Sequence, residues 1–301
     1  MSKESYLLAL DGSKESLAAA NMAWKLARAR DAKLVALSVV DNQAIWDLLG
    51  EGLPGFIGSG PYIAAYETMQ KALKSVSETL LVAFASRSQN DQIKTECLIN
   101  EGDLLRQVFE RAKEHDLVIM GRRFRHPSTA TQDLHSFIRT SLSKRLAKIC
   151  PCPLLIIPSE SVWGKARLII SDQTFSADTL IKFLAFTDTL EIEREVFCTG
   201  AENGIDKLMQ KVKDIVPHSV TVRCHDTTDG EESFSVAIDV TPTTLLVAST
   251  QQSIEGRATC SGIELQEFLS AVPHVAVLVL PPSLTAEQTQ TAEEHVILVS
   301  P

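Results

Sequence analysis

A run of about 18 apolar residues, which a membrane-spanning helix requires, occurs nowhere in the 301 residues. The start also lacks the basic and apolar regions of a signal peptide, because Met1 leads through charged positions into a short apolar run that ends at Asp11. We therefore expect a cytoplasmic protein that does not insert into a membrane.

Cysteine is scarce, with six in the whole chain. Most of the six lie inside apolar runs, where cysteine behaves as a small hydrophobic residue. Disulfide frameworks are typical of small secreted domains. We therefore expect no disulfides here.

Basic residues are few in the second half of the sequence. Residues 161–301 contain 9 Lys and Arg against 20 Asp and Glu, whereas residues 1–160 contain 20 against 18. Nucleic-acid binding needs clustered Lys and Arg to neutralise phosphates. The acidic second half therefore argues against DNA or RNA as a partner.

Familiar catalytic motifs are absent as well. The sequence has no G-x-S-x-G and no H-E-x-x-H, and its seven histidines are scattered without metal-ligand spacing. The segment from Gly50 to Gly55 matches G-x-G-x-x-G, but no strand precedes it directly and Pro54 suits a phosphate-binding turn poorly. We therefore expect no enzyme.

Short apolar runs alternate with stretches of helical spacing along the chain. Tyr6–Leu10 predicts a strand, Asp11-Gly12-Ser13 a turn with Ser13 as helix N-cap, and Lys33–Val40 a second strand that is apolar on both faces. Residues 41–61 are rich in Gly and Pro and predict a loop. The later pattern predicts helices at 62–88, from 102 and before Pro151, and strands at 93–99, 117–120 and 154–157. Such alternation is typical of a parallel sheet.

The pattern then repeats. Arg167–Asp172 is similar to Tyr6–Asp11, and Pro273–Leu280 is similar to Pro151–Ile157. Asp11 and Pro151 are 140 residues apart in the first copy, whereas Asp172 and Pro273 are 101 residues apart in the second. Most of the difference falls between the second and third strands. We predict an α/β fold with two consecutive doubly wound, Rossmann-like domains, each with five parallel strands in the order 3-2-1-4-5.

The predicted domains are residues 1–160 and 166–282. An acidic linker follows at 283–294, and the apolar run at 295–299 predicts a C-terminal strand that joins a sheet edge or covers an apolar patch; a frayed end is the alternative. In a doubly wound sheet, ligands bind at the carboxyl ends of the strands where the winding reverses. Here this crevice lies between Asp11-Gly12 and Gly121.

Several motifs together resemble the universal stress protein family. They are Asp11-Gly-Ser13, Glu101-Gly-Asp103, Val118-Ile-Met-Gly121 and Pro151-Cys-Pro153. The resemblance covers residues 5–158 clearly and 166–282 weakly. It implies an adenine-nucleotide-hydrolase-like fold, in which ATP is held by the first-strand Asp, by backbone at the end of the second strand and by a G-2X-G-9X-G-(S/T) loop. These roles transfer to Asp11, to Val39 or Val40, and to Gly121.

The rest of that loop departs from the family pattern. Phe124 stands at the second glycine, Thr140-Ser141 stands where Gly-Ser is expected, and the spacing from Gly121 to Thr140 is 19 residues instead of 13. The second copy keeps the spacing of 13 but reads Ser249, Gln252, Gly262 and Ile263. Side chains at glycine positions crowd a triphosphate, so ATP is a possible ligand of the first domain and no cofactor is certain.

Arginines offer another way to hold an anion. Guanidinium groups bind phosphate in a bidentate manner, so charge could replace the backbone cradle. The candidates are Arg122, Arg123, Arg125 and Arg139, with Ser141 near a helix N-terminus. The simpler interpretation, which the sequence favours, is that these arginines are solvated on a surface loop.

Two cysteines and a histidine lie near strand ends in the second domain. Cys198 ends its second strand, and Cys224-His225 ends the third. If these strands are neighbours, the three side chains could converge on a soft metal such as Zn²⁺. Inert cysteines are the better explanation, so we predict no metal site.

Three functions fit these features. The first is a non-enzymatic stress-response regulator whose two domains pack face to face as an intramolecular pseudo-dimer, or form a homodimer, and which binds a small anionic ligand or a regulatory protein. The second is an ATP-binding protein with weak ATPase activity. The third is an adaptor that docks on a transporter or regulator through the second domain and the tail.

Overall fold

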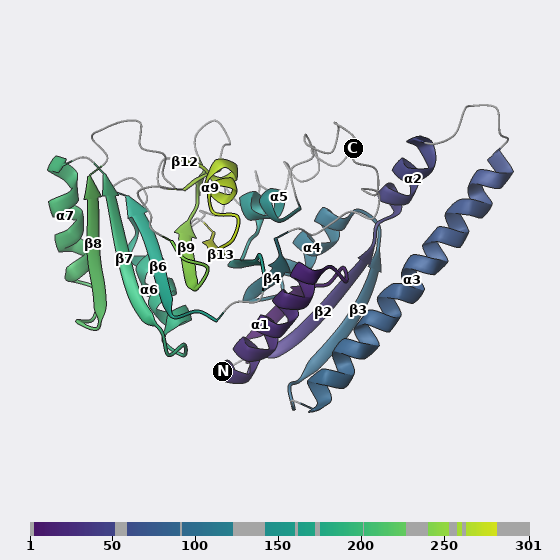
Figure 1. Cartoon of the computed structure of the whole chain (residues 1–301), viewed down its shortest axis with the longest axis horizontal. Helices are drawn as coiled ribbons and strands as arrows, with labels where there is room; N and C mark the ends of the chain where they lie inside the picture. Colours follow the sequence, from purple (N-terminus) through teal and green to yellow (C-terminus); the bar gives the residue numbers. More distant parts are fainter. Residues whose placement is uncertain are drawn as a thin grey trace.

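The computed structural model describes residues 3–51, 59–90, 92–122, 142–159, 162–171, 175–200, 202–226, 240–252, 258–260 and 263–281. Its central feature is one ten-stranded sheet with the order β3-β2-β1-β4-β5-β13-β9-β6-β7-β8 (Figure 1). The strands of the first half are β1 (Ser5–Ala9), β2 (Lys33–Val40), β3 (Thr95–Glu101), β4 (Leu117–Gly121) and β5 (Leu154–Ile157). Those of the second half are β6 (Lys165–Ser171), β7 (Glu193–Gly200), β8 (Val220–Asp226), β9 (Thr244–Ser249) and β13 (Ala276–Leu280).

Each half of the sheet has the predicted order 3-2-1-4-5. Within each half all neighbouring strands are parallel, which confirms the doubly wound fold. The halves meet at β5 and β13, which pair antiparallel with Leu155 opposite Leu278. The limits given above for the two domains stay predictions.

The expected face-to-face packing of the two domains is wrong, because the halves join edge to edge. β5 and β13 would otherwise each end their half with a row of unpaired N–H and C=O groups. Pairing with each other satisfies these groups and buries both strands fully. Residues 295–299, the other predicted sheet-edge segment, lie outside the described residues.

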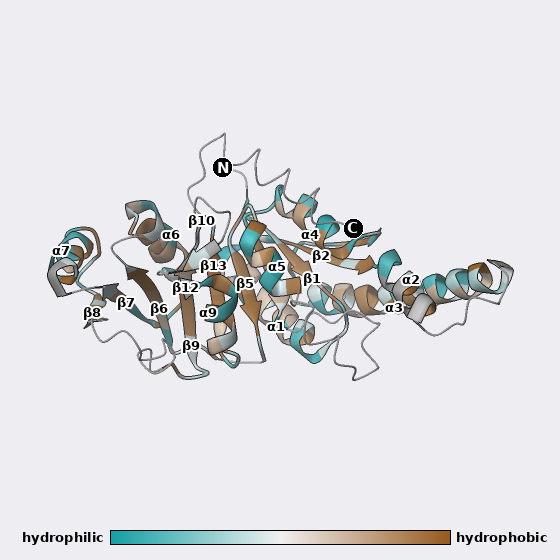
Figure 2. Ribbon diagram, turned by 90° about the horizontal axis from the view of Figure 1, so that it is seen from above, coloured by the Kyte–Doolittle hydropathy of each residue, from teal (hydrophilic) through white to brown (hydrophobic). Residues whose placement is uncertain are grey.

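Helices cover both faces of the sheet. One face carries α1 (Lys14–Arg30), α3 (Ser59–Asn90), α6 (Ala177–Thr187) and α7 (Glu202–Lys213) over a single apolar core that runs through both halves. The other carries α4 (Leu104–Ala112), α5 (Leu142–Ile149) and α9 (Leu265–Ala271) over a second core. Strands coloured as hydrophobic lie in the middle of the molecule, with helices on both sides of them (Figure 2).

The start of α1 follows the sequence prediction closely. Ser13 has an extended backbone, and its side-chain oxygen accepts a hydrogen bond from the Ser16 N–H at 3.1 Å. This contact satisfies one of the N–H groups that a helix start leaves without a partner. Ser13 is therefore the N-cap that fixes where β1 ends and α1 begins.

Replacing Ser13 by alanine should lower the free energy of unfolding by about 1 kcal/mol, the usual cost of losing an N-cap side chain. Chemical denaturation checks this value. Ser176 provides a control, because it is the N-cap of α6 but makes no side-chain capping bond. An equal loss for Ser176→Ala would contradict the assigned role of Ser13.

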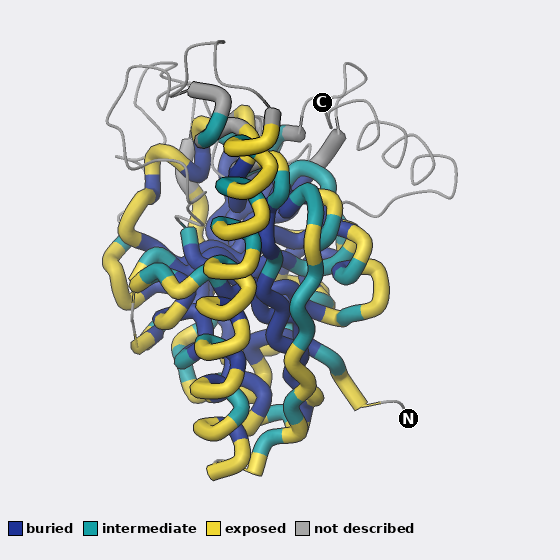
Figure 3. The backbone as a smooth tube through the Cα atoms, turned by 90° about the vertical axis from the view of Figure 1, so that its right-hand side faces the viewer, coloured by how far each residue is buried: buried dark blue, intermediate teal, exposed yellow. Residues whose placement is uncertain are grey.

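The predicted loop at 41–61 is wrong in its first part, which forms the helix α2 (Asn42–Glu51). The Gly and Pro residues that suggested a loop begin only near its end, and Asn42–Leu49 contains none. Trp46 of α2 stacks on Tyr66 of α3, with ring centroids 4.5 Å apart. The two helices extend beyond the sheet, and α3 runs along the outside with much of its surface exposed (Figures 1 and 3).

Two arginines of the first half bond to helix ends of the second half. On one face, Arg30 donates to the carbonyl oxygens of Ala185 and Phe186 at 2.5 and 2.6 Å. On the other, Arg122 donates to three carbonyl oxygens at and just beyond the end of α9, those of Leu269, Val272 and Val275, at 2.6 to 2.9 Å. The last carbonyls of a helix carry partial negative charge and have no partner within the helix, so each arginine is a C-terminal cap supplied across the junction.

Among the described helices, none combines the length and apolar character needed to cross a bilayer. This finding agrees with the absence of a long apolar run in the sequence.

Candidate functional site

The predicted crevice begins where β1 turns into α1. Asp11 is partly exposed there, and its Oδ1 accepts a hydrogen bond from the Ser13 N–H at 2.9 Å. Gly12 has a φ of 77°, in the left-handed region that glycine adopts without strain. The turn therefore places a partly exposed carboxylate at the carboxyl end of β1, directly before the positive end of α1.

Hydrogen bonds at the end of β2 distinguish between Val39 and Val40, which the sequence left as alternatives for a backbone contact to the ligand. The Val40 carbonyl accepts from the Gly102 N–H at 3.0 Å, so the backbone of Val40 faces β3. Backbone groups of successive strand residues point to opposite sides. The backbone groups of Val39 therefore face β1. Those of Leu37 do the same, because the Leu37 carbonyl accepts a hydrogen bond from the Leu10 N–H. The polar backbone of Val39 is thus directed past the end of β1 beside Asp11.

Gly121 ends β4 directly against the first turn of α1. A Cβ atom placed on Gly121 would lie 2.7 Å from the carbonyl carbon of Glu15 and from the Ser16 nitrogen. These are backbone atoms that cannot rotate away. The requirement for glycine at this position is thus set by helix packing, and this contact brings the carboxyl ends of β1 and β4 together.

The helix α3 adds a wall that the sequence did not reveal. A Cβ atom on Gly12 would meet the Leu80 side chain at 4.0 Å, so α3 passes over the turn after β1. The buried Ser77 and Ser38 hydroxyls bond at 2.9 Å and fasten α3 to β2. The helical pattern of α3 was clear from the sequence, but no local signal indicated that it reaches the crevice.

The structure gives Arg122 a different place from the one predicted. Its guanidinium is bound by carbonyls of the second half, so it is directed to the junction and not into the crevice. Burial lowers the pKa of Arg122 to about 10, and the group remains charged at neutral pH. The remaining predicted loop residues, Arg123, Arg125, Arg139, Thr140 and Ser141, lie outside the described residues.

The corresponding loop of the second half takes another form. Its described residues pair as a small antiparallel sheet of β10 (Gln251–Gln252), β11 (Ala258–Cys260) and β12 (Ile263–Glu264). At the end of β9, where the first half has Gly121, the Ser249 hydroxyl accepts from the Thr179 hydroxyl of α6 at 3.3 Å. These contacts favour the first half as the place for a ligand.

The strand register also changes one predicted equivalence between residues of the two halves. Thr250 bonds to the end of β13 as Arg122 bonds to the end of β5, so Ser249 corresponds to Gly121. The pairing of β1 with β4 and of β6 with β9 then makes Ser171 the residue of the second half that is equivalent to Asp11. It lies one residue before the Asp172 suggested by the sequence. Ser171 is buried, and a hydroxyl stands where the first half has a carboxylate.

The cysteines considered for a metal are neighbours, as predicted. Cys198 of β7 and Cys224 of β8 are register partners. Cys198 is buried and Cys224 is exposed. The part of the chain that the structure describes holds no group of three or more His, Cys, Asp or Glu side chains placed to bind a metal ion.

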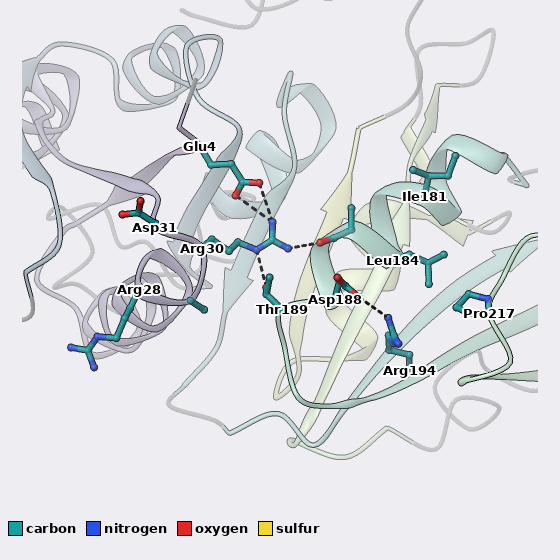
Figure 4. Close-up of a pocket in the computed structure, with 12 residues that line it drawn as sticks. Glu4, Arg28, Arg30, Asp31, Ile181, Leu184, Asp188, Thr189, Arg194 and Pro217 are labelled. Carbon is teal, nitrogen blue, oxygen red and sulfur yellow. Dashed lines mark hydrogen bonds and ion pairs between the residues drawn. The ribbon is translucent and has the colours of Figure 1, made fainter. Parts of the chain in front are cut away.

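A separate groove of about 880 Å³ lies at the other end of α1, where it meets α6 (Figure 4). Arg30 crosses it and also binds Glu4 and Thr189, at 3.2 and 3.1 Å. Arg194 pairs with Asp188 at 3.5 Å. These charges already bind one another, so the groove is a feature of the junction between the halves.

Comparisons with known proteins agree with this architecture. The model of the universal stress protein family matches residues 5–158. A universal stress protein of Methanocaldococcus jannaschii is 27% identical over 149 residues, which are 49% of this chain and 77% of that protein.

Solved structures extend the similarity of fold to both halves. A universal stress protein from Archaeoglobus fulgidus has a TM-score of 0.61 at 15% identity and covers 93% of this chain and 99% of its own. A protein described as a universal stress protein from Pseudomonas aeruginosa has a TM-score of 0.55 at 13% identity, with 98% of both chains covered. Because the family model matches just over half of the sequence, this chain belongs to the universal stress protein family.

Proposed function

We propose that this chain is a stress-response protein that binds a nucleotide or a related phosphate-bearing ligand in its first half, and that it acts by binding and not by catalysis. The observation that carries the proposal is the convergence of Asp11, the Val39 backbone and Gly121 at the start of α1. A carboxylate can accept hydrogen bonds from ribose or from an adenine amino group, and a helix N-terminus favours an anion.

The arrangement of the second half supports a division of roles. Its loop after β9 is partly folded into a small sheet, and a hydroxyl-bearing Ser249 replaces the glycine that ends β4. The second half instead supplies the helix ends that Arg30 and Arg122 bind. The ligand site therefore belongs to the first half, and the second half supports it as a fixed partner.

Ligand-dependent melting of the full chain tests the proposal. ATP with Mg²⁺, ADP, AMP, cyclic AMP and inorganic phosphate are the probes. A ligand present at 100 times its Kd should stabilise the protein by about 2.7 kcal/mol. We expect at least one nucleotide to raise the Tm of the wild type and to raise that of Asp11→Ala much less.

Asp31→Asn is the matched control, because it removes an exposed carboxylate from the opposite end of the same helix. It should keep the full ligand response. An unchanged Tm with every probe would contradict nucleotide binding, and an equal response in Asp11→Ala would contradict the site. Release of phosphate from ATP well above the buffer rate, lost in Asp11→Ala, would contradict a role without catalysis.

A further inference from the structure

Cys198 and Cys224 form a pair across the two outermost strands of the second half. They are direct register partners of the parallel strands β7 and β8. Neighbouring strands lie about 4.8 Å apart, and disulfides join residues whose Cα atoms are about 4.4–6.8 Å apart. The backbone therefore holds these two residues at a separation that a disulfide can span.

Both side chains also lie on the same face of the sheet. Strand side chains alternate, and Cys198 shares its face with Val196 just as Cys224 shares its face with Val220. Val196, Cys198 and Val220 all belong to the core under α6 and α7. The two sulfur atoms are therefore directed to the same side, as a bond between them requires.

The two thiols differ in their access to solvent. Cys198 is completely buried, whereas Cys224 is exposed. A small oxidant can reach the exposed thiol directly, and the buried one is then its immediate neighbour. In this arrangement the accessible sulfur reacts first with the oxidant. The second sulfur then attacks the sulfenic acid that has formed and converts it to a disulfide.

The other cysteines in the described residues lack this combination. Cys97 is exposed on β3, but its register partner is Ala36. Cys260 is buried, and its register partner is Ile263. Cys150 and Cys152 lie close together just before β5, where a hydrogen bond between the two and burial raise the pKa of Cys152. A thiol with a raised pKa is a poor nucleophile at neutral pH.

We propose that Cys198 and Cys224 are a redox modification site that a hydroperoxide converts to a disulfide. The Cys224 thiolate attacks a peroxide oxygen, the O–O bond breaks, and a sulfenic acid forms on Cys224 while water or an alcohol leaves. The Cys198 sulfur then attacks the Cys224 sulfur, the S–O bond breaks and water leaves. Two thiols are oxidised and one hydroperoxide is reduced. The product joins the edge strand β8 covalently to β7.

Peptide mapping of the full-length protein after treatment with hydrogen peroxide tests this site. Trypsin cuts after Arg194, Lys207, Arg223 and Arg257, so the two cysteines fall in separate peptides, residues 195–207 and 224–257. We expect these peptides to become linked through a bond that dithiothreitol cleaves. Thiols outside the pair should react more slowly.

Two variants separate the steps. In Cys198→Ala the sulfenic acid on Cys224 should persist and be trapped by dimedone, whereas the wild type should give at least about tenfold less of this adduct. In Cys224→Ala, Cys198 should be oxidised at least about tenfold more slowly, because burial limits access. Cys97→Ala is the control and should still form the link. Unlinked peptides with a stable adduct on wild-type Cys224, or a link that requires Cys97, would overturn the proposal.

Discussion

Replacing Gly121 by alanine is expected to lower the free energy of unfolding by about 3 kcal/mol, at the upper end of the usual cost of overpacking. The added Cβ would lie 2.7 Å from two backbone atoms of α1, so the helix must move away from β4. Thermal or denaturant unfolding measures the loss. We expect a decrease in Tm of about 6 °C or more.

Gly164→Ala is the matched control for this change, because a Cβ at Gly164 meets nothing within 4 Å. Its Tm should stay within about 2 °C of the wild type. A similar Tm for Gly121→Ala would show that α1 does not lie against β4 as described. The same variant should also lose nucleotide binding, since moving α1 displaces the turn that carries Asp11.

Replacing Arg122 by methionine is also expected to cost about 3 kcal/mol. Methionine fills part of the volume but leaves the carbonyls of Leu269, Val272 and Val275 without their charged donor. Hydrogen bonds to a charged group contribute about 1.5–3 kcal/mol each, and unsatisfied buried acceptors add a penalty of their own. Denaturant unfolding, followed by a change in midpoint, measures the effect.

Two comparisons locate this effect at the junction. Arg145 lies on the neighbouring helix α5, and Arg145→Met should change stability by less than about 0.5 kcal/mol. Arg30→Met should fall between the two, because Arg30 binds two carbonyl oxygens of the second half whereas Arg122 binds three. Equal losses for Arg122→Met and Arg145→Met would contradict the capping role of Arg122.

Most of the fold could be predicted from local patterns. The limits of β2 were predicted to the residue, because the apolar run that follows Lys33 is interrupted only by Ser38 and stops at Asp41, and Ser13 showed where α1 starts. The helix α2 was missed because the Gly and Pro residues that follow it dominated the composition of residues 41–61. The joining of β5 to β13 could not be predicted, since apolar strands that pack face to face and strands that pair at their edges have the same pattern.

The candidate site was predictable in its position but not in all of its contacts. The switch in winding direction placed Asp11 and Gly121 at neighbouring strand ends, and the structure brings them to the same turn of α1. The role of Arg122 was not predictable, because its acceptors lie 147 to 153 residues away along the chain. Nothing near Arg122 in the sequence distinguishes a helix cap from a phosphate ligand.

The antiparallel pairing of β5 with β13 also has an evolutionary consequence. Two separate chains that met through these strands would fall apart on dilution, and any substitution would appear on both sides of their symmetric contact. Within one polypeptide the contact survives at any concentration, and each side can change alone. Arg122 illustrates this freedom, because Thr250 occupies the corresponding position and is too short to copy its reach.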